Sequence, residues 1–172
     1  MTDRPEGPQI NLRPMTLADL DQVEEIDQAS FPTPWPKKAF RYELEQNQNA
    51  LCWVAEWIEP GWDPVIVAAI VIWLILDEAH IGTLAVRPGY RGQGIAQRLL
   101  ARTLLESGGS GATHAMLEVR ASNQAAQQLY LKFGFESVGI RRNYYQDTQE
   151  DAILMTLGKI DPKKLADLAH CG

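Results

Sequence analysis

A glycine-containing segment at residues 86–96 is the part of this sequence whose residue types and spacing first suggest chemistry. It ends an apolar, strand-like run and opens an amphipathic helix. Gly92 and Gly94 leave the backbone unobstructed, so successive N–H groups can face a ligand at the positive end of the helix, where the first four donors lack partners within the helix. The segment therefore predicts an anion site, and it is one way to build a pocket for a pyrophosphate.

The same segment argues against two common nucleotide chemistries. No Gly-Lys-Ser/Thr follows it, as a P-loop requires, and the full G-x-G-x-x-G pattern of a dinucleotide-binding turn is missing. Nucleotide hydrolysis and hydride transfer are therefore disfavoured. The structural alternative is a glycine turn that only lets a helix pack closely on a sheet, and the segment by itself leaves both interpretations open.

A carboxylate and three histidines are the other candidates for chemistry. Glu118 lies near the C-terminal end of a predicted strand, where a carboxylate by itself is usually solvated. His114 shares that strand face, because side chains alternate along a strand, and could join a proton relay or pack in the structure. His80, His114 and His170 are scattered and make no metal-ligand pattern, so we expect no metal.

The elements that must position these residues alternate between strands and helices. The patterns of apolar residues and turn residues predict strands at residues 10–13, 51–58, 64–76, 80–86, 113–120, 135–142 and 152–157. Helices are predicted after the Thr16 cap, at residues 36–46, from Gly94 to Ser107, and from a cap at Ser122 or Asn123 to Gly134. The order βααβββαβαββ indicates a mixed α/β domain.

Composition limits the class of protein further. The 172-residue chain has a net charge of −6, which argues against a general nucleic-acid binder and favours a basic partner. Cys52 and Cys171 are too few for a disulfide framework or a cysteine metal site. The N-terminus lacks the apolar core of a signal peptide, and the longest apolar run is too short to span a bilayer. We expect a cytoplasmic protein that binds neither nucleic acid nor membrane; the oligomeric state stays open.

Several motifs together resemble a known family. Residues 91–96 fit the Arg/Gln-x-x-Gly-x-Gly/Ala signature of the GCN5-related N-acetyltransferase (GNAT) superfamily, in the expected strand-to-helix setting. Closer resemblance to its RimI branch comes from residues 31–35, 117–123, 129–130, 133–135, 141–145 and 150–152. It implies a single GNAT-like domain at residues 10–158, with an arm at 1–9 and a tail at 159–172. The implied sheet is mixed and mostly antiparallel, with helices on both faces.

The resemblance implies acetyl-CoA as cosubstrate and assigns residues to it. The pantetheine arm would pair with strand amides at Leu84, Ala85 and Val86, whose side chains can still belong to the core. The pyrophosphate would lie in a cradle made by Arg91, Gly92, Gln93, Gly94, Ile95 and Ala96. Asn123 would contact the cofactor, cap its own helix, or do both.

The resemblance also assigns catalytic and acceptor-binding roles. Glu118 would be the general base, and Tyr130 the general acid that protonates the departing thiolate. A peptide groove would be lined by Trp35, Arg141, Asn143, Tyr144 and Tyr145. Aromatic residues also favour strands for structural reasons, so packing is an alternative for each tyrosine. The acidic residues Asp147, Glu150 and Asp151 could attract a basic N-terminus or solvate a turn.

The leading hypothesis is a protein N-alpha-acetyltransferase in which the acceptor amine attacks acetyl-CoA directly, without an acyl-enzyme or a metal. RimI-type enzymes act on the N-terminal alanine of a small-subunit ribosomal protein, which makes a protein N-terminus the expected partner. At pH 7 roughly a tenth of an α-amine is neutral, but well under a thousandth of lysine, so the α-amine is the easier nucleophile. The alternatives are acetylation of lysine or small amines, and a non-catalytic CoA-binding module.

Overall fold

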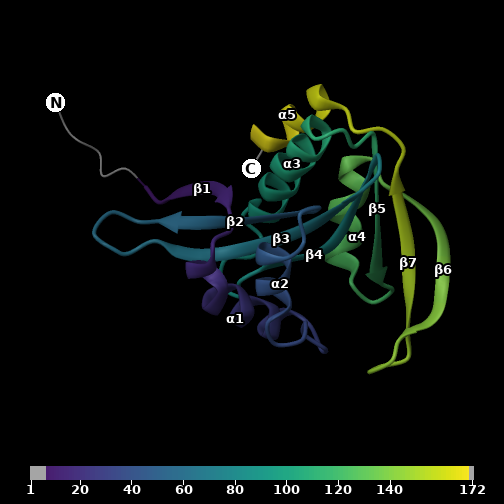
Figure 1. The fold of residues 1–172 in the computed structure, drawn as a ribbon, viewed down its shortest axis with the longest axis horizontal. Coiled ribbons are helices and arrows are strands. Elements are labelled where there is room, and N and C mark those ends of the chain that lie inside the picture. Colours follow the sequence, from purple (N-terminus) through teal and green to yellow (C-terminus); the bar gives the residue numbers. More distant parts are fainter. Residues whose placement is uncertain (1–6, 171–172) are drawn as a thin grey trace.

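The computed structural model describes residues 7–170, which form one seven-stranded sheet with helices on both faces (Figure 1). The strands are β1 (Gln9–Pro14), β2 (Ala50–Ile58), β3 (Val65–Ile75), β4 (Glu78–Val86), β5 (His114–Arg120), β6 (Glu136–Tyr145) and β7 (Glu150–Leu157). The helices are α1 (Leu20–Ser30), α2 (Ala39–Glu45), α3 (Ile95–Gly109), α4 (Gln124–Phe133) and α5 (Pro162–His170), with a 3-10 turn at Leu17–Asp19. The predicted order is confirmed, and α5 follows it.

The sheet has the strand order β1-β2-β3-β4-β5-β7-β6. Within the described residues, β4 and β5 form its one parallel pair, and this pair is short: Glu78 to His80 align with His114 to Met116. All other neighbouring strands are antiparallel and pair over more of their length. Because β4 and β5 continue beyond the three pairs, they separate toward their C-terminal ends, and a gap opens in the middle of the sheet.

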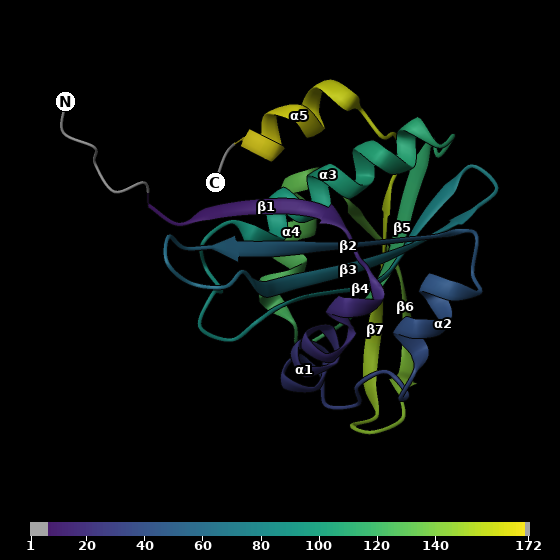
Figure 2. The same ribbon diagram turned by 60° about the vertical axis from the view of Figure 1, so that its left-hand side comes forward.

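Two apolar layers hold the helices on the sheet, with α1 and α2 on one face and α3 and α5 on the other (Figure 2). On the first face, Val23 and Phe40 pack into a buried cluster with Val71. On the second face, Leu99 of α3 and Phe133 of α4 belong to a larger cluster. Residues Ile66 to Ile72 of β3 are buried without alternation, because both faces of this strand are covered.

The structure differs from the predicted elements in two places. Helix α2 begins at Ala39 and not at Pro36, because Lys38 adopts a left-handed conformation with φ of 71°. Residues 159–170, which the predicted boundaries leave in a tail, contain α5; Leu165 is 2% exposed and α5 packs on α3. Residues 1–6, which make up most of the predicted arm, lie outside the described residues. Cys171 lies outside them too. No helix in the described range is long and apolar enough to cross a membrane.

Candidate active site

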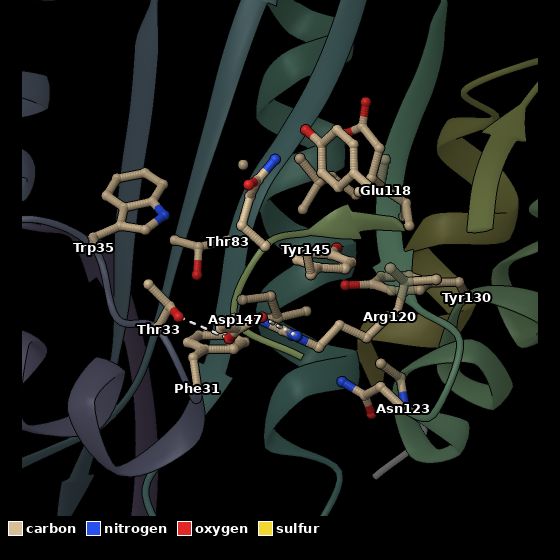
Figure 3. Close-up of a pocket in the computed structure, with 18 residues that line it drawn as sticks. Phe31, Thr33, Trp35, Thr83, Glu118, Arg120, Asn123, Tyr130, Tyr145 and Asp147 are labelled. Carbon is tan, nitrogen blue, oxygen red and sulfur yellow. Dashed lines mark hydrogen bonds and ion pairs between the residues drawn. The ribbon is translucent and has the colours of Figure 1, made fainter. Parts of the chain in front are cut away.

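A pocket of about 450 Å³ lies where β4 and β5 separate (Figure 3). Its walls include residues 81–84 of β4 and 117–120 of β5, neither of which belongs to the paired part of the two strands. The α1–α2 loop and the β6–β7 hairpin close it from other sides. The gap in the sheet therefore forms part of this pocket.

Glu118 lines this pocket from β5. Leu117 and Val119 are buried on the opposite face, in the core with α3 and α4. The carboxylate is 15% exposed, and its Oε2 lies 2.8 Å from Nε2 of His80 on β4. His114, the histidine that shares the strand face, instead lies 3.3 Å from Glu78. The sequence prediction missed His80, because only the register of β4 against β5 brings it to Glu118.

Tyr130 lines the same pocket from α4. It is 7% exposed and its ring packs at 5.6 Å from that of Phe135. Burial, together with the nearby Tyr145, raises the pKa of the Tyr130 phenol well above its ordinary value. The predicted cap is confirmed, because Asn123 Oδ1 accepts the Ala126 N–H at 3.1 Å and so fixes the start of α4. A phenol in this setting keeps its proton at neutral pH and has it available for donation.

The glycine loop has the backbone conformation that an anion cradle needs. Gly92 and Gly94 have φ angles of 75° and 76°, and α3 begins directly after them. A Cβ on Gly92 would meet nothing within 4 Å, so the loop opens onto free space. Arg91 donates to the Val86 carbonyl at 2.9 Å and to Ser30 Oγ at 3.1 Å, which ties the loop to β4 and α1. The residues present fit a pyrophosphate.

Trp35 forms the wall opposite Tyr130 and belongs to an aromatic stack. Its ring stacks on Phe40 at 4.8 Å and on Trp73 at 5.9 Å. Its backbone N–H donates to Asp27 Oδ2 at 2.7 Å, and burial raises the pKa of Asp27. The other oxygen, Oδ1, has no hydrogen-bond partner among the described residues. The α1–α2 loop is therefore anchored at Trp35 by both stacking and a hydrogen bond.

Asp147 connects the two rims of the pocket. It accepts hydrogen bonds from Thr33 at 2.7 Å and from Arg120 at 2.9 Å, and in Figure 3 it lies between them. The Arg120 guanidinium, 4.0 Å from the Tyr145 ring centroid, holds the pKa of Asp147 well below its usual range. Burial raises the pKa of Tyr145 to about 12. Asp147 therefore pairs within the protein, and we name the group Thr33, Asp147 and Arg120 the rim clasp.

The pocket collects many of the predicted site residues, but others lie elsewhere. The predicted residues that line it are Trp35, Leu84, Glu118, Asn123, Tyr130, Tyr144 and Tyr145. Ala85, Val86 and residues 91–96 are not among the residues that line it; they lie at the end of β4 and in the glycine loop that leads into α3. Arg141 and Asn143 are exposed on β6; Arg141 lies over the Tyr144 ring at 5.7 Å, and the Asn143 N–H donates to Asp151. Phe31 and Thr33, from the loop that was predicted to face the last hairpin, also line the pocket, whereas Thr83 was missed by the prediction.

Two further chemistries have no support within residues 7–170. No group of three or more His, Cys, Asp or Glu side chains is arranged to hold a metal ion there. Cys52 is buried in the cluster under α1, and this burial raises the pKa of its thiol to about 12. A thiol in that state is a poor nucleophile, and it does not line the pocket.

A sheet that separates in its middle, with a carboxylate and a tyrosine in the gap and a glycine loop at the start of α3, is consistent with the class of acetyl-CoA-dependent acetyltransferases that the sequence motifs predicted. Comparison with known proteins agrees: residues 20–135 match the acetyltransferase (GNAT) family. The chain belongs to this family, as the sequence motifs predicted.

Relatives cover most of the chain. A Bacillus subtilis protein is 40% identical over 144 residues, which are 84% of this chain and 92% of the relative. The Escherichia coli ribosomal protein bS18-alanine N-acetyltransferase is 37% identical over 154 residues, covering 83% and 93%. Its crystal structure aligns with a TM-score of 0.75 over 87% of this chain and 93% of that one. Arabidopsis thaliana NAA60 with acetyl-CoA shares the fold at a TM-score of 0.78, 22% identity and coverages of 87% and 99%.

Proposed function

We propose that this protein transfers an acetyl group from acetyl-CoA to the N-terminal alanine of ribosomal protein bS18, in the cytoplasm. Support comes from the E. coli relative, whose name states this acceptor and which aligns with nearly the whole of this domain. The observation that carries the chemistry is the pocket at the β4–β5 gap, because Glu118 and Tyr130 line it together. Glu118 offers a proton acceptor, and Tyr130 offers a proton donor.

In the proposed reaction the acceptor nitrogen forms a bond to the acetyl carbon while the carbon–sulfur bond breaks. Glu118 takes the proton that the amine loses, directly or through water, and Tyr130 gives its proton to the leaving thiolate. The raised pKa keeps the Tyr130 phenol protonated at neutral pH, but it also makes the phenol a weaker acid. A backbone amide near Val86 would stabilise the developing oxyanion.

The remaining site residues bind the two substrates. Strand amides at Leu84, Ala85 and Val86 run along the pantetheine arm, and the loop at residues 91–96 holds the pyrophosphate. Trp35, Tyr144 and Tyr145 contact the acceptor peptide, with Arg141 and Asn143 further along the hairpin. Direct transfer is supported by Cys52, the cysteine within residues 7–170, which is buried away from the pocket with its thiol protonated.

Mass spectrometry of acceptor peptides tests this proposal. One peptide carries the bS18 N-terminus with a free α-amine, and a matched peptide has a blocked N-terminus and an internal lysine. We expect acetylation of the first alone, and an about 100-fold loss of kcat in Glu118→Gln and in Tyr130→Phe. Acetylation of lysine or of a small amine, with every N-terminal peptide unmodified, would reject the acceptor assignment. Full turnover by both variants would reject the assigned roles.

A further inference from the structure

His80 holds the carboxylate of Glu118 at the point where β4 and β5 separate. It is the last β4 residue paired with β5, and its partner there is Met116. Glu118 lies two residues beyond Met116 on the same strand face, so the 2.8 Å contact between the two side chains spans the beginning of the gap. The two side chains are 19% and 15% exposed, which limits competition from water.

The imidazole of His80 is itself fixed by its neighbours. It meets the Trp73 ring edge-on, at 5.5 Å and 86°, and Trp73 is its register partner on β3. The Trp73 indole N–H donates to Glu43 Oε2 at 3.0 Å, and its ring stacks on Trp35. His80 does not line the pocket, whereas Glu118 does. His80 can therefore influence the reacting groups only through Glu118.

We propose that His80 is a positioning residue that orients Glu118 for proton transfer from the acceptor amine. The inference rests on the proposed function, because it needs Glu118 to be the base. An ionised carboxylate only accepts hydrogen bonds, so Nε2 of His80 carries the hydrogen in this contact. Oε2 is then occupied, and Oε1 is the oxygen left to receive the proton from the amine. Fixing the carboxylate in advance removes rotamers that point away from the acceptor.

The hydrogen bond does not depend on the charge of His80, because an imidazole can donate from Nε2 both in its neutral Nε2–H form and as a cation.

Other ionisable groups face this pair from each neighbouring element. They are Glu78 and His114 on β4 and β5, Glu43 of α2 through Trp73, and Tyr145 of the hairpin. A substitution at His80 removes none of these groups and leaves the acceptor amine in place. A change of kcat in a His80 variant consequently reports the loss of the contact with Glu118.

Three variants test the inference in acetylation of the bS18 N-terminal peptide. His80→Ala removes the hydrogen bond and should lower kcat about tenfold, with KM for acetyl-CoA unchanged. His80→Gln keeps an N–H donor, so it should recover to within about threefold of wild type. His114→Ala is the matched control, since it removes a histidine that pairs with a different glutamate; its kcat should equal that of wild type.

The variant Glu118→Gln separates this inference from the proposed function. If Glu118→Gln loses activity and His80→Ala does not, the inference about His80 fails alone. If Glu118→Gln is fully active, the proposed base is wrong. His80→Ala should cause no further loss in the Glu118→Gln background, because its effect passes through that carboxylate. Equal losses in His80→Ala and His80→Gln, with a lowered Tm and weaker acetyl-CoA binding, would show a purely structural role and overturn the inference.

Discussion

Replacing Gly82 with alanine should disturb both the fold and Glu118, the carboxylate proposed as the base. Gly82 lies on β4, two residues after His80, and an added Cβ would lie 2.8 Å from Cη2 and 3.0 Å from Cζ2 and Cζ3 of Trp73. Real Cβ atoms essentially never make contacts under 3.0 Å, so either the strand or the indole must move. These atoms belong to one rigid ring, which cannot relieve the contact by a rotation of its end.

The indole of Trp73 has little freedom to move. It stacks nearly parallel on Trp35, at 4° and 5.9 Å, and its N–H donates to Glu43. Overpacking a well-packed site costs about 1–3 kcal/mol. We therefore expect Gly82→Ala to lower the free energy of unfolding by roughly 2 kcal/mol, which corresponds to a fall in Tm of about 4–8 °C for a domain of this size. The shifted ring should also displace His80 and lower kcat.

Urea denaturation and steady-state kinetics measure these two effects. Gly139→Ala is the matched control, because its Cβ would come no closer than 4.0 Å to Leu154 and it also lies on a strand; it should stay within about 0.5 kcal/mol of wild type. Trp73→Phe removes the three ring atoms in the clash, so Gly82→Ala should cost less in that background. A Gly82→Ala protein as stable and as active as the Gly139→Ala control would refute the reasoning.

Three further perturbations address other parts of the site and the fold. Gly92→Val places a β-branched residue at a φ of 75° and should raise KM for acetyl-CoA about tenfold in initial-rate kinetics, with KM for the peptide unchanged; an unaltered KM for acetyl-CoA would contradict the cradle. Asp147→Asn removes the charge that Arg120 pairs with in the rim clasp and should raise KM for the peptide about fivefold; a change confined to KM for acetyl-CoA would contradict this. Hydrogen bonds from Arg13 lower the pKa of Glu56 and, with Thr16, outweigh burial to lower that of Asp19. Their contribution to stability is therefore present above the ordinary carboxyl pKa values near 4 and is lost as the pH falls. Arg13→Met should be about 1 kcal/mol less stable at pH 7 and lose less stability between pH 7 and pH 3 in denaturation followed by circular dichroism; the same acid sensitivity as wild type would contradict this.

Features that depend on neighbours in sequence were predictable. Alternation along residues 113–120 was sufficient to place Glu118 opposite the core, because a strand has a period of two. Asn123 could be recognised as a cap because a short polar side chain precedes a helical apolar pattern. The glycine loop was found for the same reason, since its conformation follows from the residue types in the loop itself.

Features that depend on register were not predictable. The contact of His80 with Glu118 joins residues 38 positions apart, and Thr33 meets Asp147 across 114 positions. No feature of the sequence of β4 or of β5 indicates that the two strands align for three residues and then separate. Helix α5 was also not predicted, because the apolar residues of this short segment are explained only by their packing on α3. In the sequence His80 was assessed only as a possible metal ligand, whereas in the structure it contacts the carboxylate of Glu118.

The separation of β4 from β5 explains why the site lies where it does. Up to His80, β4 is paired on both edges; beyond it, only the edge toward β3 is paired within the described residues. A strand edge left without partners presents regularly spaced N–H and C=O groups, and burying them unpaired would cost about 1–3 kcal/mol each. An extended ligand arm with amide groups can pair with this edge as another strand would, which is the binding that we propose for pantetheine. The same three-residue pairing leaves His80 beside Glu118 at the closed end of the gap. Lengthening the β4–β5 ladder would therefore remove the cofactor edge and the space for the amine together.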